Sequence, residues 1–112
     1  MAGFRIDRLN EDIMRELAAL MRDRVKDPRV DVSTVSIVRT DLSNDGSHCK
    51  VYVSSLGGIE AARTAVRGLE SASGLLRKEV ANKLKMKKCP EFKFIADDSI
   101  EFAANIDKLI QK

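Results

Sequence analysis

The sequence contains few of the side chains that stack on nucleobases or hold metals. Among its 112 residues there are no tryptophans, one tyrosine, four phenylalanines, one histidine and two cysteines. Proteins that read single strands by stacking bases on aromatic rings need more exposed rings than this. No Cys-x-x-Cys or His-x-x-x-His spacing occurs, which excludes the common zinc motifs. No apolar run approaches the roughly 20 residues of a membrane-spanning helix, so we expect no membrane partner.

Side chains that could form a catalytic site are equally scarce. His48 and Cys49 are adjacent in a predicted strand, so they point to opposite faces and cannot act as a nucleophile pair. Asp97 and Asp98 precede Ser99, where acidic residues are better explained as favourable charge at a helix start. We therefore expect a binding protein that is not an enzyme and needs no cofactor and no metal.

Charged residues are abundant and bound the class of protein. They make up 33% of the chain against 44% hydrophobic residues, and the formal net charge is +3. This balance is typical of a folded protein with a well-solvated surface, and the length fits one domain spanning 1–112. The N-terminus lacks the long apolar core of a signal peptide, and the two cysteines have no metal spacing. Both features favour a cytoplasmic protein with reduced thiols.

The hydrophobic periodicity predicts an α+β fold. The expected elements are a helix over 6–26, strands over 32–40 and 48–54, helices over 59–70 and 75–86, a strand over 90–94 and a last helix over about 99–111. A three-stranded sheet with helices on one face is a stable layer arrangement for this order. No internal repeat or linker interrupts it.

Two local features leave alternatives open. In the first strand Val35 and Ile37 share a face, while Val32 and Val38 have the other parity. Either a β-bulge or a strand that is apolar on both faces explains this pattern. Gly74 ends the helix before it, either as a left-handed cap or at a sharp kink.

Positive charge is concentrated near the end of the chain. Between residues 77 and 93 there are seven Lys or Arg and two Glu. Winding a helix at about 100° per residue places Arg77, Lys85 and Lys88 in a narrow sector with Lys78 at its edge. Such a stripe suits a polyanion, of which nucleic acid is the commonest for a soluble protein. The alternative is an ordinary solvated helix face.

A second basic row is predicted on the first helix. Arg8, Arg15 and Arg22 are spaced by seven residues and lie almost opposite the apolar stripe of that helix. Glu11 can pair with Arg15 four residues later. The row is therefore either a salt-bridged solvent face or a surface that faces RNA.

Several short segments together resemble one family, bacterial ribosome-binding factor A. The segments are Asp27-Pro28-Arg29, Lys50-Val51-Tyr52-Val53-Ser54, the break Ala72-Ser73-Gly74, Leu75-Leu76-Arg77, Pro90-Glu91-Phe92-Lys93-Phe94 and Asp97-Asp98-Ser99. The resemblance extends from about Arg5 to Ile110. It implies a type II KH-like fold in which the usual Gly-x-x-Gly loop is replaced by the Ala-x-Gly kink of residues 72–74.

The resemblance also implies a function. Members of the family bind the small (30S) ribosomal subunit near its neck and support maturation of 16S rRNA, including processing of its 5′ end, above all in the cold. They are not nucleases. We hypothesise that Arg77, Lys78, Lys85 and Lys88 contact rRNA phosphates, with Arg8, Arg15 and Arg22 as a second surface. Ala72 carries a Cβ where a KH loop has glycine, which disfavours a close backbone clamp on a single strand.

Two other functions fit the same residues. One is a general KH-type protein that binds single-stranded RNA, and the other is a protein–protein adaptor whose basic face docks an acidic partner. The first requires stacking-dependent binding, and the second requires binding that survives nuclease treatment. In each case we expect a monomer, because the pattern leaves no large apolar face unused.

Overall fold

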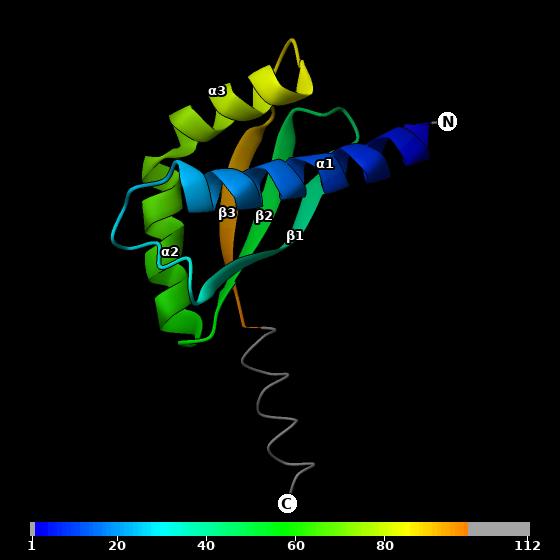
Figure 1. Cartoon of the computed structure of the whole chain (residues 1–112). Coiled ribbons are helices and arrows are strands. Elements are labelled where there is room, and N and C mark those ends of the chain that lie inside the picture. Colours follow the sequence, from blue (N-terminus) through cyan, green and yellow to red (C-terminus); the bar gives the residue numbers. More distant parts are fainter. Residues whose placement is uncertain (1, 99–112) are drawn as a thin grey trace, which may run out of the picture.

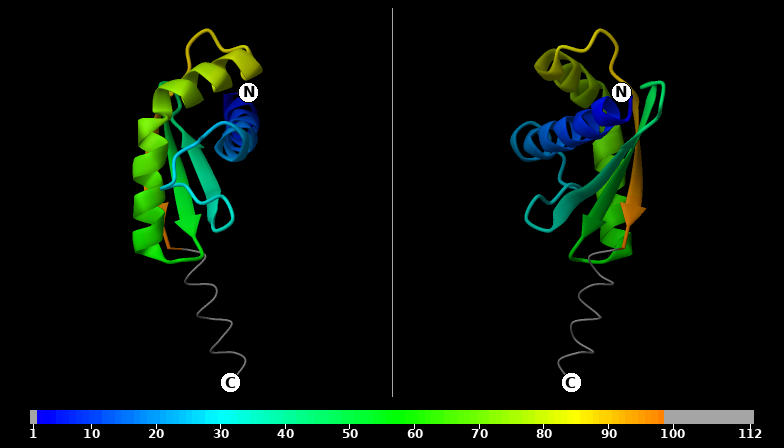
Figure 2. Two further views of the ribbon diagram at one scale, coloured as in Figure 1. Left: turned by 60° about the vertical axis from the view of Figure 1, so that its left-hand side comes forward. Right: turned by 90° about the vertical axis from the view of Figure 1, so that its right-hand side faces the viewer.

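The chain folds as a three-stranded sheet with helices packed against one face (Figures 1 and 2). A computed structural model describes residues 2–98. The elements are α1 (Ala2–Asp23), β1 (Val35–Leu42), β2 (His48–Ser55), α2 (Ile59–Ser71), α3 (Ser73–Leu84) and β3 (Glu91–Asp97). The predicted α+β class and the order of these elements are confirmed. The last predicted helix, over 99–111, lies outside the described residues.

The sheet has the order β1-β2-β3 with mixed strand directions. β1 and β2 form an antiparallel hairpin, whereas β2 and β3 are parallel, with Val51 opposite Phe94. Parallel neighbours need a long crossover, which α2 and α3 supply. Cys49, Val51 and Val53 alternate toward the helices and are fully buried. Burial raises the pKa of the Cys49 thiol to about 11, so this cysteine is an inert core residue.

A β-bulge explains the irregular pattern of the first strand. The register of β1 against β2 shifts between Ile37 and Arg39. Val35 and Ile37 are buried before the shift, and Thr40 and Leu42 are buried after it. The extra residue therefore changes which parity faces the core, and the alternative of a strand that is apolar on both faces is wrong.

The first strand begins three residues later than predicted because Asp31 organises a turn. The carbonyl oxygen of Asp31 accepts hydrogen bonds from the backbone N–H groups of Thr34 and Val35, at 3.0 and 2.9 Å. Its carboxylate accepts the backbone N–H of Ser33 at 3.1 Å, an interaction that competes with strand pairing. Val32 is thereby kept out of the sheet and is 46% exposed.

The connection from α1 to β1 packs closely against α2 at Gly68. Asp27 and Arg29 form a two-pronged ion pair, with oxygen–nitrogen distances of 2.7 and 3.0 Å, and this hydrogen bonding lowers the pKa of Asp27 to about 2. Arg29 also donates to the hydroxyl of Ser71 at 3.0 Å. A Cβ on Gly68 would lie 2.7 Å from Cγ2 of Val30. Only glycine lets the connection approach α2 this closely.

The break between α2 and α3 is a sharp kink at Ala72, and a left-handed cap at Gly74 is wrong. Ala72 has φ −93° and ψ 5°, a conformation that any residue can adopt. Its N–H bonds to the carbonyl oxygens of Gly68 and Leu69, and its own carbonyl accepts the N–H of Leu76 at 2.9 Å. Because backbone groups satisfy one another across the kink, Gly74 is free to lie within the first turn of α3.

Candidate nucleic-acid interface

The arginine row of α1 is exposed and largely unpaired. Arg8, Arg15 and Arg22 all lie on the solvent side of the helix. Arg15 lies 3.7 Å from a carboxylate oxygen of Asp12, so its predicted pairing with Glu11 is wrong. Within residues 2–98 neither Arg8 nor Arg22 forms an ion pair. An exposed ion pair such as that of Arg15 contributes only about 0–1 kcal/mol. Arg15 can therefore exchange Asp12 for a phosphate, and all three arginines remain available to a polyanion.

The basic helix is shorter than its sequence indicates. It ends at Leu84, and Lys85 takes the left-handed conformation with φ 55°. The N–H groups of Lys85 and Met86 both reach the carbonyl of Ala81, which closes the last turn. The predicted sector that joins Arg77 to Lys85 and Lys88 is therefore wrong, because both lysines lie beyond the helix.

Arg77 faces the connection between α3 and β3. Its Nη2 donates to the carbonyl oxygen of Cys89 at 3.2 Å, and its Nε is buried with no hydrogen-bond partner within residues 2–98. The guanidinium thus holds Cys89, near the end of the connection, against the first half of α3. Lys78, one residue later, is exposed. The structure separates these neighbours, with Arg77 as a positioning residue for the connection and Lys78 available to a ligand.

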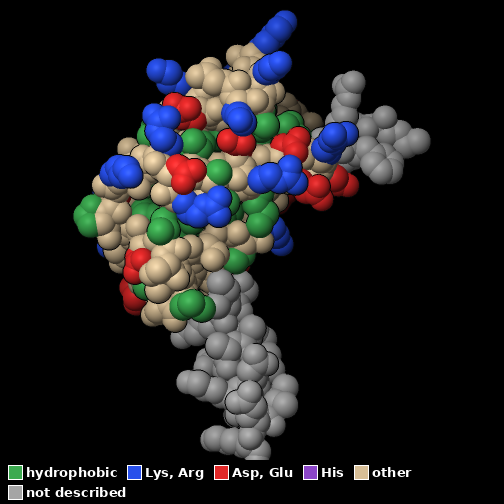
Figure 3. All heavy atoms as spheres, viewed as in Figure 1, with side chains coloured by type: hydrophobic (Ala, Val, Ile, Leu, Met, Phe, Trp, Pro, Cys, Tyr) green, Lys and Arg blue, Asp and Glu red, His purple; other side chains and the backbone are tan. Residues whose placement is uncertain are grey.

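A single basic surface spans α1, α3 and the connection that follows α3. α1 and α3 pack against each other, and Arg24 joins them through an ion pair with Glu79 at 3.5 Å. Figure 3 shows Lys and Arg side chains over both helices, with acidic side chains between them. We call this the α1–α3 surface, and its exposed members are Arg8, Arg15, Arg22, Lys78, Lys83, Lys85, Lys87 and Lys88.

Two members of this surface were not predicted from the sequence. Lys83 is exposed in the last turn of α3, and Lys87 is exposed in the connection to β3. On a helix continued to residue 88, both lysines lie outside the sector that contains Arg77, Lys85 and Lys88. Their positive charge could have indicated them, but the sequence did not show that the helix ends before Lys85. Lys93, by contrast, alternates with the buried Phe94 and lies on the open face of the sheet.

The kink motif offers little backbone to a ligand. Ala72 packs against the core, and Ser73 is half-buried. Gly74 is exposed, and a Cβ there would meet nothing within 4 Å. The kink therefore lacks the glycine-rich loop with which KH modules clamp a strand, so a nucleic-acid ligand would have to rely on other contacts, such as those of Lys and Arg with its phosphates.

Replacing Lys85 with glycine is expected to make the protein more stable although it removes a positive charge from the surface. The left-handed conformation costs a lysine roughly 1 kcal/mol that glycine does not pay, so Lys85→Gly should raise the free energy of unfolding by about 0.5–1 kcal/mol. The same change removes one charge from the α1–α3 surface. Urea denaturation measures the first effect. Lys85→Ala is the control, and a Lys85→Gly variant less stable than Lys85→Ala would contradict the assignment of this helix end.

Fold and surface together define a class of protein. A β-hairpin, two helices that meet at a kink and a third strand parallel to the second form the type II KH-like arrangement. The exposed cations on its helical side are typical of proteins that bind nucleic-acid phosphates. Within residues 2–98, no three His, Cys, Asp or Glu side chains are grouped as a metal would require, and no helix is long and apolar enough to cross a membrane.

Comparison with known proteins identifies the family. The family model for ribosome-binding factor A matches residues 5–110, so the chain belongs to the ribosome-binding factor A family. Ribosome-binding factor A from Heliobacterium modesticaldum is 44% identical over 110 residues, covering 98% of this chain and 89% of that protein.

Solved structures agree with this assignment. The crystal structure of ribosome-binding factor A from Thermus thermophilus superposes with a TM-score of 0.68 at 27% identity, covering 81% of this chain and 94% of the other. A homology model of the Thermus thermophilus protein, as fitted into the cryo-EM map of a 30S complex, matches with a TM-score of 0.59 at 28% identity, covering 75% of this chain and 86% of the other. That relative binds the 30S subunit.

Proposed function

We propose that this protein is an assembly factor that binds the small ribosomal subunit and supports maturation of its 16S rRNA. The α1–α3 surface carries the proposal, because it presents exposed cations on the fold of a family with a 30S-bound member. The protein acts by binding and catalyses no reaction. It works in the cytoplasm as a monomeric domain spanning 1–112, and its contribution is greatest in the cold.

The mechanism we propose is selective binding of an immature rRNA conformation near the neck of the subunit. Lys78, Lys85 and Lys88 contact phosphates on one side of the surface, and the arginines of α1 contact them on the other. Arg77 contributes by holding the connection that carries two of these lysines. A binding protein shifts an equilibrium only when it prefers one state. Release therefore follows when the mature rRNA no longer fits the surface, and processing of the 5′ end proceeds.

The first experiment is co-sedimentation of the purified protein with immature and mature small subunits. Affinity that comes from phosphate contacts falls steeply with ionic strength. We expect binding to immature subunits to weaken by at least about 100-fold between about 50 and 200 mM salt, if at least four contacts form. A folded protein that stays in the supernatant with both kinds of subunit would refute the proposed function. Binding that survives nuclease treatment of the subunits would indicate a protein partner instead.

A further inference from the structure

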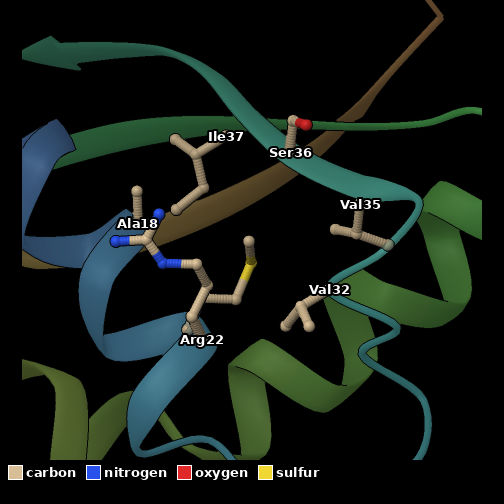
Figure 4. A pocket seen from close by; sticks show the side chains of 7 residues that line it. Ala18, Arg22, Val32, Val35, Ser36 and Ile37 are labelled. Carbon is tan, nitrogen blue, oxygen red and sulfur yellow. The ribbon is translucent and has the colours of Figure 1, made fainter.

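A small pocket lies between α1 and the start of β1, beside the α1–α3 surface (Figure 4). Its volume is about 290 Å³, at the lower limit of the roughly 300–1,000 Å³ of pockets that enclose drug-sized molecules. It is lined by Ala18, Met21, Arg22, Val32, Val35, Ser36 and Ile37. The pocket is thus sized for a group of one or two rings, and its lining combines apolar side chains with the polar groups of Arg22 and Ser36.

The walls of the pocket come from both sides of the gap between helix and strand. Val35, Ile37 and Met21 are at most 7% exposed and form a floor anchored in the core. Val32, which the Asp31 turn holds out of the sheet, forms an exposed wall. Figure 4 shows the Arg22 side chain running toward Ile37, across the pocket from Val32. Because the floor belongs to the core and Val32 is held by the Asp31 turn, these two sides of the pocket are fixed by the fold.

The charge at the rim selects the kind of ligand. Arg22 forms no ion pair within residues 2–98 and continues the row of Arg8 and Arg15 on α1. A planar guanidinium can stack on a nucleobase or hold its phosphate, and the thioether of Met21 makes favourable contacts with aromatic rings. Among the residues that the structure describes, few other rings can stack on a base, since Phe94 is buried, Phe92 packs against the core and the ring of Tyr52 is covered by Arg39 at 4.3 Å.

We propose that this pocket receives one unpaired nucleobase of the RNA whose phosphates contact the α1–α3 surface. The base inserts between Arg22 and Val32, and the apolar floor excludes water from its faces. The pocket lies at the β1 edge of the sheet, whereas the kinked pair α2 and α3 connects β2 to β3 at the other edge. The inference rests on the proposed function and adds to it a position at which a single base, and not only backbone charge, is recognised.

Two charge-preserving substitutions test the pocket. Ala18→Leu fills it at a helical position where leucine costs little, and Arg22→Lys keeps the charge but removes the planar stacking group. Since stacking of one base contributes about 1–3 kcal/mol, we expect each variant to bind immature subunits at least about 5-fold more weakly. Arg67→Lys, at an exposed position of α2 outside both the pocket and the α1–α3 surface, is the matched control and should bind like the wild type. Thermal denaturation checks that all three variants remain folded.

Chemical probing of the rRNA bases gives the direct readout. With wild-type protein bound, dimethyl sulfate or carbodiimide modification should decrease at one unpaired base, and Ala18→Leu should restore that modification at saturating protein. If the wild type binds subunits but Ala18→Leu binds and protects equally well, the pocket inference is wrong and the proposed function stands. If Ala18→Leu weakens binding without changing the modification of any rRNA base, the pocket binds a ribosomal peptide beside β1. This result also overturns the inference. If the wild type does not bind subunits, both proposals fail.

Discussion

Replacing Gly68 with alanine is expected to destabilise the protein by about 3 kcal/mol, at the upper end of the cost of overpacking a core. The new Cβ would lie 2.7 Å from Cγ2 of Val30 and 3.3 Å from side-chain carbons of Asp27 and Arg29. These residues are held in place by the Asp27–Arg29 ion pair and its bond to Ser71, so they cannot move away at little cost. Thermal denaturation should show a melting temperature lower by more than about 10 °C.

The same substitution at Gly74 provides the matched control. Gly74 lies in the first turn of α3, and a Cβ there would meet nothing within 4 Å. Because alanine favours the helix over glycine, Gly74→Ala should raise the free energy of unfolding by up to about 1 kcal/mol. Equal melting temperatures for the two variants would show that the α1–β1 connection does not pack against α2 as described.

Reversing two charges on the α1–α3 surface is expected to weaken binding to immature small subunits by at least about 100-fold. Lys78→Glu/Lys85→Glu removes two charge-assisted contacts, each worth about 1.5–3 kcal/mol. The slope of log affinity against log salt should fall by about two. Arg77 is left unchanged, because its bond to the carbonyl of Cys89 makes it part of the fold. Co-sedimentation across a salt series measures both quantities.

The control for charge reversal uses the open face of the sheet. Lys50 and Lys93 are exposed neighbours on β2 and β3, and Lys50→Glu/Lys93→Glu makes the same change in net charge. We expect this variant to keep the wild-type salt slope and to lose less than about 10-fold in affinity through long-range electrostatics. If both double variants lose affinity equally, the contact is not confined to the α1–α3 surface.

The fold was predictable where side-chain periodicity decides the structure. The apolar stripe of α1 and the alternation of Cys49, Val51 and Val53 correctly indicated a helix and a half-buried strand. The bulge could be foreseen only as one of two alternatives, because it depends on how β1 meets β2. The Asp31 turn was missed, since Val32 has the propensity of a strand residue and only the hydrogen bonds of the turn exclude it.

The candidate site was less predictable, because it depends on where α3 ends. Residues 85–88 contain no glycine, proline or asparagine to mark the end, and a lysine takes the left-handed position instead. Arg77 had the sequence signature of a ligand-binding cation, yet its environment turns it toward Cys89. The pocket beside Arg22 had no signal at all, since its walls come from α1, from β1 and from the Asp31 turn, which lie together only in the folded protein.

The parallel pairing of β2 with β3 has a consequence for synthesis of the chain. β2 is the central strand, and its partner on one side is the last described element, separated from it by α2 and α3. Until β3 leaves the ribosome, that edge of β2 is unpaired, and Phe94 is absent from the core. Non-local pairing of this kind is slow, and an open strand edge can join another chain. A nascent chain that stalls before Glu91 therefore exposes an unpaired strand edge, so the protein is most vulnerable to aggregation before β3 has been synthesised.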